Sequence, residues 1–195
     1  MRRVATALRA RGVEPVETRE PGGTPVAEAI RTLLLEPGRR LAPAEELLLI
    51  VTARAHHVAE VIRPALEAGR VVLCDRFHLS TLAYQGAGRG LPTEEIRRLN
   101  DRATGGLRPD LTVVLDVRPE TGFARKSGGA DRMERSGAEF HERVARAYRA
   151  LAASEPHVVL VDGERQESEV AAEVARVLAA RLPGTFGPAA GLDDT

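Results

Sequence analysis

The stretch that decides the fold is residues 71–76, which read Val-Val-Leu-Cys-Asp-Arg. A short apolar run that carries β-branched residues and ends in charged ones is typical of a parallel strand covered on both faces. The pattern recurs at 111–117, Leu-Thr-Val-Val-Leu-Asp-Val, and at 157–161, His-Val-Val-Leu-Val. A short extended segment is also expected at 13–18. The sequence therefore predicts a sheet of short parallel strands.

Amphipathic stretches separate these runs, with apolar residues at helical spacing. We expect helices at 3–11, from 25 to about 34, and at 44–68, 93–104, 119–126, 137–153 and 168–182. Strands that alternate with helices predict an α/β fold, an open parallel sheet with helices on both faces. One domain is expected over 1–182, and residues 183–195 are expected to form a disordered C-terminal tail.

Three local signals refine the helices. Thr24 and Pro25 have the residue types of an N-cap and a first helical position. Ser136 and Glu139 form a candidate capping box before the helix at 137–153. Pro64 predicts a bend in the long helix at 44–68, because proline has no amide hydrogen to donate.

Composition excludes several classes of protein. The chain has 195 residues, with 28 Lys and Arg against 28 Asp and Glu, so no overall positive field favours nucleic acid or an acidic membrane. Cys74 is the single cysteine, which excludes an internal disulfide and a cysteine-rich metal site and favours a reducing compartment, the cytoplasm. The five histidines lack metal-binding spacing and are expected to be packing or surface residues. No apolar run is long enough to span a membrane, and no signal peptide is visible.

Polar residues cluster directly after the predicted strands, where open parallel sheets bind ligands. The stretch from Thr18 to Thr24 follows the first extended segment, Asp75 and Arg76 follow the run at 71–74, and Asp116 ends the run at 111–115. Arginines at neighbouring strand ends can form a fork whose paired donors match the oxygens of a phosphate group. This edge of the sheet is the predicted site for an anionic ligand.

Several of these segments together resemble the bacterial thymidylate kinase family, over residues 1 to about 182. They are TREPGGT at 18–24, ARAHH at 53–57, DRFHLSTLAYQG at 75–86, RPDL at 108–111 and DRME at 131–134. The resemblance implies a P-loop-kinase-like fold and transfer of a phosphoryl group from ATP with Mg²⁺ to thymidine monophosphate (dTMP). The product is the diphosphate, dTDP, a step toward dTTP. Such a transfer requires positioning and charge neutralisation more than covalent catalysis.

The resemblance also implies roles at the anionic end of the site. Arg19 and Arg76 would hold the monophosphate of the acceptor. Asp75, where the family keeps an acidic group near the metal, would orient Arg76 or bind a water on Mg²⁺.

At the nucleoside end, the resemblance implies that Arg54 contacts the edge of the thymine, with Thr81 as a second polar contact. Tyr84 would lie against the deoxyribose and exclude a 2′-hydroxyl by crowding. The remaining members of the implied substrate-binding set are Glu20, Ser80 and Gln85.

Residues 122–132 are similar to the family's lid. Arg125, Lys126 or Arg132 could move onto the transferring phosphoryl group, and the sequence leaves open which of them acts. Asp162 opens the loop where the family places the purine, so Arg125 and Asp162 are the residues expected on the ATP side. The largely apolar helix at 44–62, in a family that commonly dimerises through helices, predicts a homodimer.

Two features depart from the family. The sequence has no G-x-x-x-x-G-K-S/T loop, the element that holds ATP phosphates in this class, nor the strand that precedes it. We therefore expect an N-terminally truncated, inactive fragment that lacks the central strand, with unpaired strand edges at 71–74 and 111–116. Ile50 occupies the position where relatives commonly carry a phenylalanine that stacks on thymine. The alternatives are a non-catalytic nucleotide-binding paralogue and a nucleoside monophosphate kinase of altered base specificity.

Overall fold

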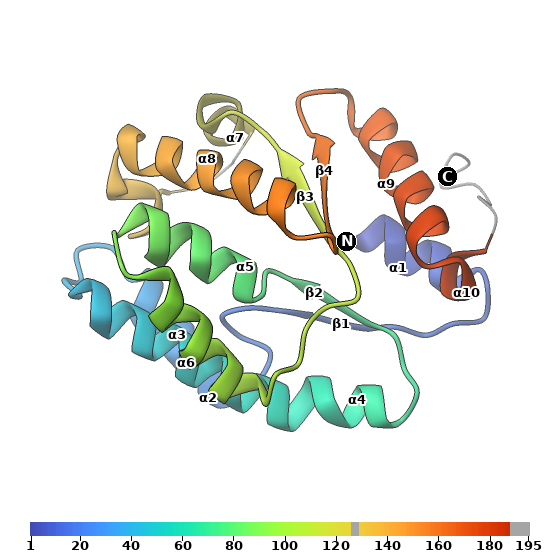
Figure 1. Cartoon of the computed structure of the whole chain (residues 1–195), viewed down its shortest axis with the longest axis horizontal. Helices are drawn as coiled ribbons and strands as arrows, with labels where there is room; N and C mark the ends of the chain where they lie inside the picture. The colour runs from blue at the N-terminus through green and yellow to red at the C-terminus, as the bar shows by residue number, and fades with distance from the viewer. Residues whose placement is uncertain (126–128, 188–195) are drawn as a thin grey trace.

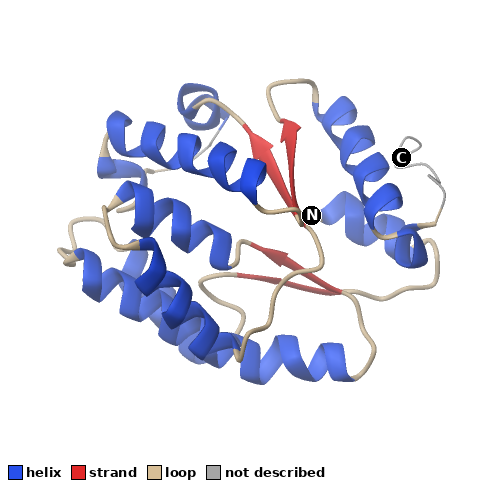
Figure 2. Cartoon of the chain, viewed as in Figure 1, coloured by secondary structure: helices blue, strands red, loops and turns tan. Residues whose placement is uncertain are grey.

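The computed structural model describes residues 1–125 and 129–187, and its strands form two separate parallel pairs (Figures 1 and 2). The first pair is β1 (Val16–Arg19) with β2 (Val72–Asp75), in a register that places Arg19 opposite Asp75. The second pair is β3 (Thr112–Asp116) with β4 (Val158–Asp162), with Asp116 opposite Asp162. Within the described residues no ladder joins β2 to β3, so the expected unpaired edges are confirmed, and the expected single sheet is divided in two.

Helices occupy most of the described chain. They are α1 (Arg2–Arg9), α2 (Pro25–Leu35), α3 (Pro43–His57), α4 (Arg63–Glu67), α5 (His78–Thr81), α6 (Thr93–Thr104), α7 (Pro119–Arg125), α8 (Ala138–Ser154), α9 (Glu167–Arg181) and α10 (Pro183–Phe186). Helices α8 and α9 both pack on the β3–β4 pair, and they lie on opposite sides of it in Figure 1. Helices α2, α3 and α6 gather beside the β1–β2 pair (Figure 1). Among the described helices, none is both long and apolar enough to cross a membrane.

The long helix expected at 44–68 is interrupted by a π-helical turn, η1 (Val58–Ile62), between α3 and α4. In this turn the amide of Arg63 donates to the carbonyl of Val58, five residues earlier. Pro64, which has no amide hydrogen, follows directly, so the change in bonding pattern falls where the sequence predicts a bend. A second π-helical segment, η2 (Leu82–Gly88), continues α5.

Two local expectations are wrong. Helix α8 is capped by Gly137, with φ of +88°, and not by Ser136, whose hydroxyl accepts a hydrogen bond of 3.0 Å from Arg89. Residues 183–187 are not disordered, because α10 places Phe186 in a core cluster with Leu8 and Leu178. Residues 188–195 lie outside the described part of the chain. The N-cap at Thr24 is confirmed, since its hydroxyl accepts from the amide of Ala27 at 3.1 Å.

Candidate active site

A cavity of about 150 Å³ lies between the end of β1, helices α2 and α3, and the start of η2. Its lining is mixed, with apolar side chains beside polar and charged ones, as is usual for small-molecule sites. The lining residues are Glu20, Pro21, Arg31, Leu34, Leu35, Ile50, Arg54, Arg76, Ser80, Thr81, Tyr84, Gln85, Asp131, Met133, Glu134 and His141. The structure thus brings together seven of the residues expected from the sequence, namely Glu20, Arg54, Arg76, Ser80, Thr81, Tyr84 and Gln85.

Arg54 is the most constrained charged side chain of the cavity, with 2% of its surface exposed. Its Nε donates to Glu20 Oε2 at 2.7 Å, and its Nη1 donates to Thr81 Oγ1 at 2.9 Å and to Asn100 Oδ1 at 2.5 Å. The guanidinium also lies 5.2 Å from the centre of the Phe77 ring. These contacts fix the plane of the guanidinium, so Arg54 presents its remaining donors in one direction.

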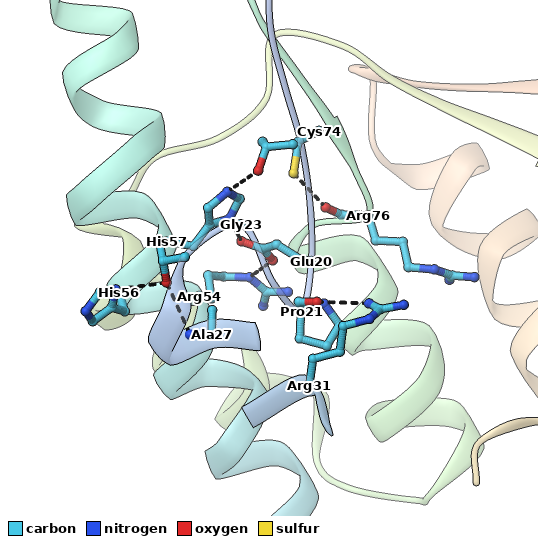
Figure 3. Close-up of polar contacts among 12 residues, drawn as sticks. Glu20, Pro21, Gly23, Ala27, Arg31, Arg54, His56, His57, Cys74 and Arg76 are labelled. Atoms are coloured by element: carbon cyan, nitrogen blue, oxygen red, sulfur yellow. Dashed lines mark hydrogen bonds and ion pairs between the residues drawn. The ribbon is translucent and has the colours of Figure 1, made fainter. Parts of the chain in front are cut away.

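Glu20 therefore holds Arg54, a role that the sequence did not indicate (Figure 3). Its second oxygen contacts Nδ1 of the fully buried His57 at 3.1 Å, and His57 Nε2 lies 2.6 Å from Thr18 Oγ1. His57 is thus a packing residue, as expected, and it also links Glu20 to Thr18. Glu20 lies in the segment at 18–24, and Arg54 and His57 lie in the segment at 53–57, but neither segment indicates that the three side chains contact one another.

Arg76 follows β2 in a left-handed conformation, with φ of +70°, which is uncommon for a residue with a side chain. The thiol of Cys74 donates to the carbonyl of Arg76 at 3.1 Å, and burial raises the pKa of that thiol. The guanidinium of Arg76 lies 5.3 Å from the centre of the Tyr84 ring. Tyr148 donates to Ser80 Oγ at 2.8 Å and packs edge-on against Tyr84. The left-handed backbone of Arg76 and the contact of its guanidinium with the Tyr84 ring together orient the Arg76 side chain along the cavity.

A third arginine, Arg31 of α2, lines the same cavity and was not expected from the sequence. It donates to the carbonyl of Pro21 at 2.9 Å, and in Figure 3 it extends to the same side as Arg76. Burial, and then the positive charges of Arg19 and Arg76, lower the pKa of Arg31. A buried arginine whose pKa is lowered by neighbouring positive charges is typical of a site that receives an anion.

Arg19 lies at the neighbouring strand end, but its side chain does not line the cavity. It forms an ion pair with Glu28 at 3.0 Å and is about half exposed. The carboxylate of Glu28 also accepts from the amide of Gly23 at 3.0 Å. The structure therefore places Arg31, and not Arg19, beside Arg76 at the cavity, while Arg19 remains within electrostatic range of Arg31.

Gln85 also lines the cavity and is held by a buried carboxylate, Glu46 of α3. Gln85 Nε2 donates to Glu46 Oε1 at 2.7 Å. Arg89 Nε donates to the same oxygen at 3.2 Å, and Arg132 Nη1 pairs with Glu46 Oε2 at 2.7 Å. Neither Glu46 nor Arg89 was singled out from the sequence.

The basic residues expected in the lid lie apart from one another. Arg125 donates to the carbonyls of Gly163 and Glu164 at 2.5 and 3.0 Å, in the loop directly after β4. Asp162 is the last residue of β4 and opens that loop. Arg125 therefore contacts the two residues that directly follow Asp162. Arg132 is instead engaged by Glu46 and by the carbonyl of Leu34 at 2.6 Å. Lys126 lies outside the described residues.

Metal ligands are sparse. Across residues 1–125 and 129–187, no group of three or more Asp, Glu, His or Cys side chains could hold a metal ion. Asp75 is a single exposed carboxylate at the end of β2. One carboxylate fits Mg²⁺ only when substrate phosphates supply further ligands.

Comparisons with known proteins agree on one family. The family model described as thymidylate kinase matches residues 1–174. The thymidylate kinase of Synechococcus sp. (strain JA-3-3Ab) is 53% identical over 180 residues, which cover 92% of this chain and 87% of that protein. The thymidylate kinase of Symbiobacterium thermophilum is 49% identical over 174 residues, covering 88% and 81%. The crystal structure of thymidylate kinase from Ehrlichia chaffeensis superposes with a TM-score of 0.69 at 32% identity, covering 84% of this chain and 81% of that one.

Proposed function

Because the chain belongs to the thymidylate kinase family of phosphotransferases, we propose that the cavity between β1, α2, α3 and η2 binds the phosphoryl acceptor, dTMP. The observation that carries this proposal is the arrangement of one held arginine, Arg54, and two arginines beside each other, Arg31 and Arg76, around one cavity. Arg54 suits a carbonyl oxygen of a base, and the pair of Arg31 and Arg76 suits a phosphate group.

At the base end, Arg54 donates to a carbonyl oxygen of the thymine. Thr81 accepts a hydrogen bond from Arg54, so its own hydroxyl hydrogen is available to the ligand. Ile50 lines the cavity as an aliphatic surface for one face of the base. A stacking ring would contribute about 1 kcal/mol more than such contact, which makes polar contacts the main source of base selectivity.

At the other end, Arg76 and Arg31 hold the monophosphate and neutralise the charge that a second anionic phosphate brings near it. Tyr84, which lies between Arg76 and the aromatic side chains of Phe140 and Tyr148, forms the wall against the sugar. Closely packed rings leave little room for an added 2′-hydroxyl, which favours a deoxyribonucleotide.

Thymidylate kinases use ATP as the phosphoryl donor, generally with Mg²⁺, and we propose the same donor here, on the side of Arg125 and Asp162. The described residues fit the acceptor but not the triphosphate, because they include neither the glycine-lysine phosphate loop nor a cluster of metal ligands. We therefore assign no step to the metal or to the donor phosphates. Asp75, at the end of β2 and next to Arg76, is the carboxylate that we propose meets a metal ion carried in by phosphate.

Equilibrium binding tests the acceptor assignment. In isothermal titration calorimetry, Arg76→Gln should weaken dTMP binding at least 10-fold, since a hydrogen bond to a charged group is worth about 1.5–3 kcal/mol, and should leave binding of thymidine unchanged. Equal losses for dTMP and thymidine, or no loss for either, would overturn the assignment of Arg76 to the phosphate. A dTDP-forming assay with ATP and Mg²⁺ measures the reaction itself.

The expected homodimer is also a proposal, and surface apolar residues support it. Leu48 of α3 is 55% exposed, and Val26 and Leu33 of the adjoining α2 are 45% and 40% exposed. A second copy of the chain could cover these side chains. Sedimentation of the wild type and of Leu48→Glu should give dimer and monomer masses respectively, and a monomeric wild type would contradict the proposal.

A further inference from the structure

Glu46 is a carboxylate with 1% of its surface exposed that contacts three side chains from distant segments. Gln85 Nε2 and Arg89 Nε donate to its Oε1 at 2.7 and 3.2 Å, and Arg132 Nη1 forms an ion pair with its Oε2 at 2.7 Å. Burial opposes ionisation, but these donors outweigh it and lower the pKa of Glu46. Glu46 is therefore a carboxylate ion that can only accept hydrogen bonds.

This acceptor decides how the neighbouring amide is oriented. A glutamine amide has one donor end and one acceptor end, and only the donor end can face an ionised carboxylate. Gln85 must therefore direct Nε2 toward Glu46. Its carbonyl oxygen, Oε1, makes no hydrogen bond within the described residues, and Gln85 lines the cavity. The cavity wall consequently offers an acceptor at this position.

Arg54 supplies the matching donor. Glu20, Thr81 and Asn100 occupy Nε and Nη1, whereas Nη2 makes no hydrogen bond within the described part of the chain. Arg54 lines the same cavity as Gln85. The wall thus presents one fixed donor and one fixed acceptor, which complement a base edge with a carbonyl oxygen beside a ring N–H. Thymine and uracil have this edge at O4 and N3, whereas cytosine has the reverse, an amino group beside a bare ring nitrogen.

We propose that Glu46 is a positioning residue that fixes the Gln85 amide with its carbonyl oxygen toward the base, and so makes the cavity select thymine and uracil over cytosine. This inference rests on the proposed binding of dTMP in the cavity. Glu46 does not touch the nucleotide; it acts through Gln85. Cytosine is rejected because its ring nitrogen and Gln85 Oε1 are both acceptors, which leaves two buried polar atoms without a donor.

The substitution Glu46→Gln reverses this arrangement with almost no change in shape. The carbonyl oxygen of the new amide takes the place of Oε2, which faces Arg132 Nη1 at 2.7 Å and Arg89 Nη2 at 3.2 Å, so the NH₂ group takes the place of Oε1 and faces Gln85. Gln85 then turns its own carbonyl oxygen toward position 46 and presents its NH₂ group to the cavity. The ring N–H of thymine meets a donor, and the ring nitrogen of cytosine gains one.

The test measures equilibrium dissociation constants of dTMP, dUMP and dCMP for the full chain by isothermal titration calorimetry. For Glu46→Gln, the dTMP preference over dCMP should fall at least 10-fold, while the ratio of dTMP to dUMP stays constant, because these two bases share the same edge. Glu45→Gln is the matched control, since it removes the same charge from an exposed neighbour on α3 and should change neither ratio.

The possible results separate the inference from the function on which it rests. If Glu46→Gln weakens all three nucleotides by the same factor, or leaves the preference for dTMP over dCMP intact, Glu46 is only structural and the inference is wrong. If the wild type binds none of the three, the proposed function fails as well. Should Glu46→Gln not fold, Glu46→Asp provides the second measurement. It keeps an acceptor-only group and must retain the preference of the wild type for dTMP.

Discussion

Replacing Glu20 by glutamine tests whether a buried carboxylate holds the arginine of the base site. Glu20 and Arg54 are 4% and 2% exposed, and their 2.7 Å contact is the only ion pair of Arg54 in the described chain. Removing one charge of a buried pair costs about 3–5 kcal/mol, because the other charge stays buried without compensation. Glutamine keeps one acceptor for Arg54 Nε, so we expect a loss near the lower end, about 3 kcal/mol. For a chain of this size that corresponds to a fall in melting temperature of about 6–12 °C.

Urea unfolding followed by circular dichroism measures the loss, and Glu94→Gln provides the control. The pair of Glu94 with Arg98 is 75% exposed on both sides and 3.9 Å apart, so its loss should cost about 0.5 kcal/mol or less. A loss below about 1 kcal/mol for Glu20→Gln would refute the reasoning from burial. A stable Glu20→Gln variant that binds dTMP weakly would instead show that Glu20 contacts the nucleotide directly, as the sequence had indicated.

Three further outcomes are expected. Gly88→Ala should lower the free energy of unfolding by about 1–3 kcal/mol, because a Cβ there would lie 2.5 Å from Phe140 Cε2; an unchanged urea midpoint would contradict this packing. Gly23→Ala should destabilise the chain and weaken dTMP binding in calorimetry, because Gly23 has φ of +85° and a Cβ there would lie 2.5 Å from His57 Nε2. Burial is the main cause that lowers the pKa of His78 to about 4, so the unfolded chain takes up this proton at higher pH than the folded one. Stability should therefore fall as pH drops from about 6.5 to 4, by up to about 3 kcal/mol, and urea titrations across this range should show a smaller fall for His78→Gln.

The secondary structure was largely predictable because its signals are local. The helix expected at 93–104 is α6 with the same bounds, and the apolar runs became β2, β3 and β4 within a residue or so of their expected ends. Such runs carry their own periodicity, which does not depend on the rest of the chain. The pairing of the strands was also foreseen in one respect, since β2 and β3 have no ladder between them.

Tertiary contacts decided the features that were not predictable. Ser136 has the right residue type for an N-cap, but Arg89, 47 positions earlier, engages its hydroxyl. The segment after Pro183 has the composition of a loose tail, but Phe186 finds an apolar cluster formed by Leu8 and Leu178. In both cases a partner far away in the sequence outweighs the local preference.

The candidate site shows the same contrast between features with a local sequence signal and features that depend on distant contacts. Arg54, Gln85 and Glu20 stand in motifs that could be recognised, whereas Glu46 does not, and no motif indicates which residue orients which. Glu45 and Glu46 are adjacent acids in the first turn of α3, and only the fold separates an exposed carboxylate from a buried one that accepts from Gln85. Glu20 stands in the same relation to Arg54. Arg54 and Gln85 are thus each held by a buried carboxylate from another segment, and an ionised carboxylate only accepts hydrogen bonds. The pattern of donors and acceptors that the cavity presents therefore depends on the charge of these two carboxylates.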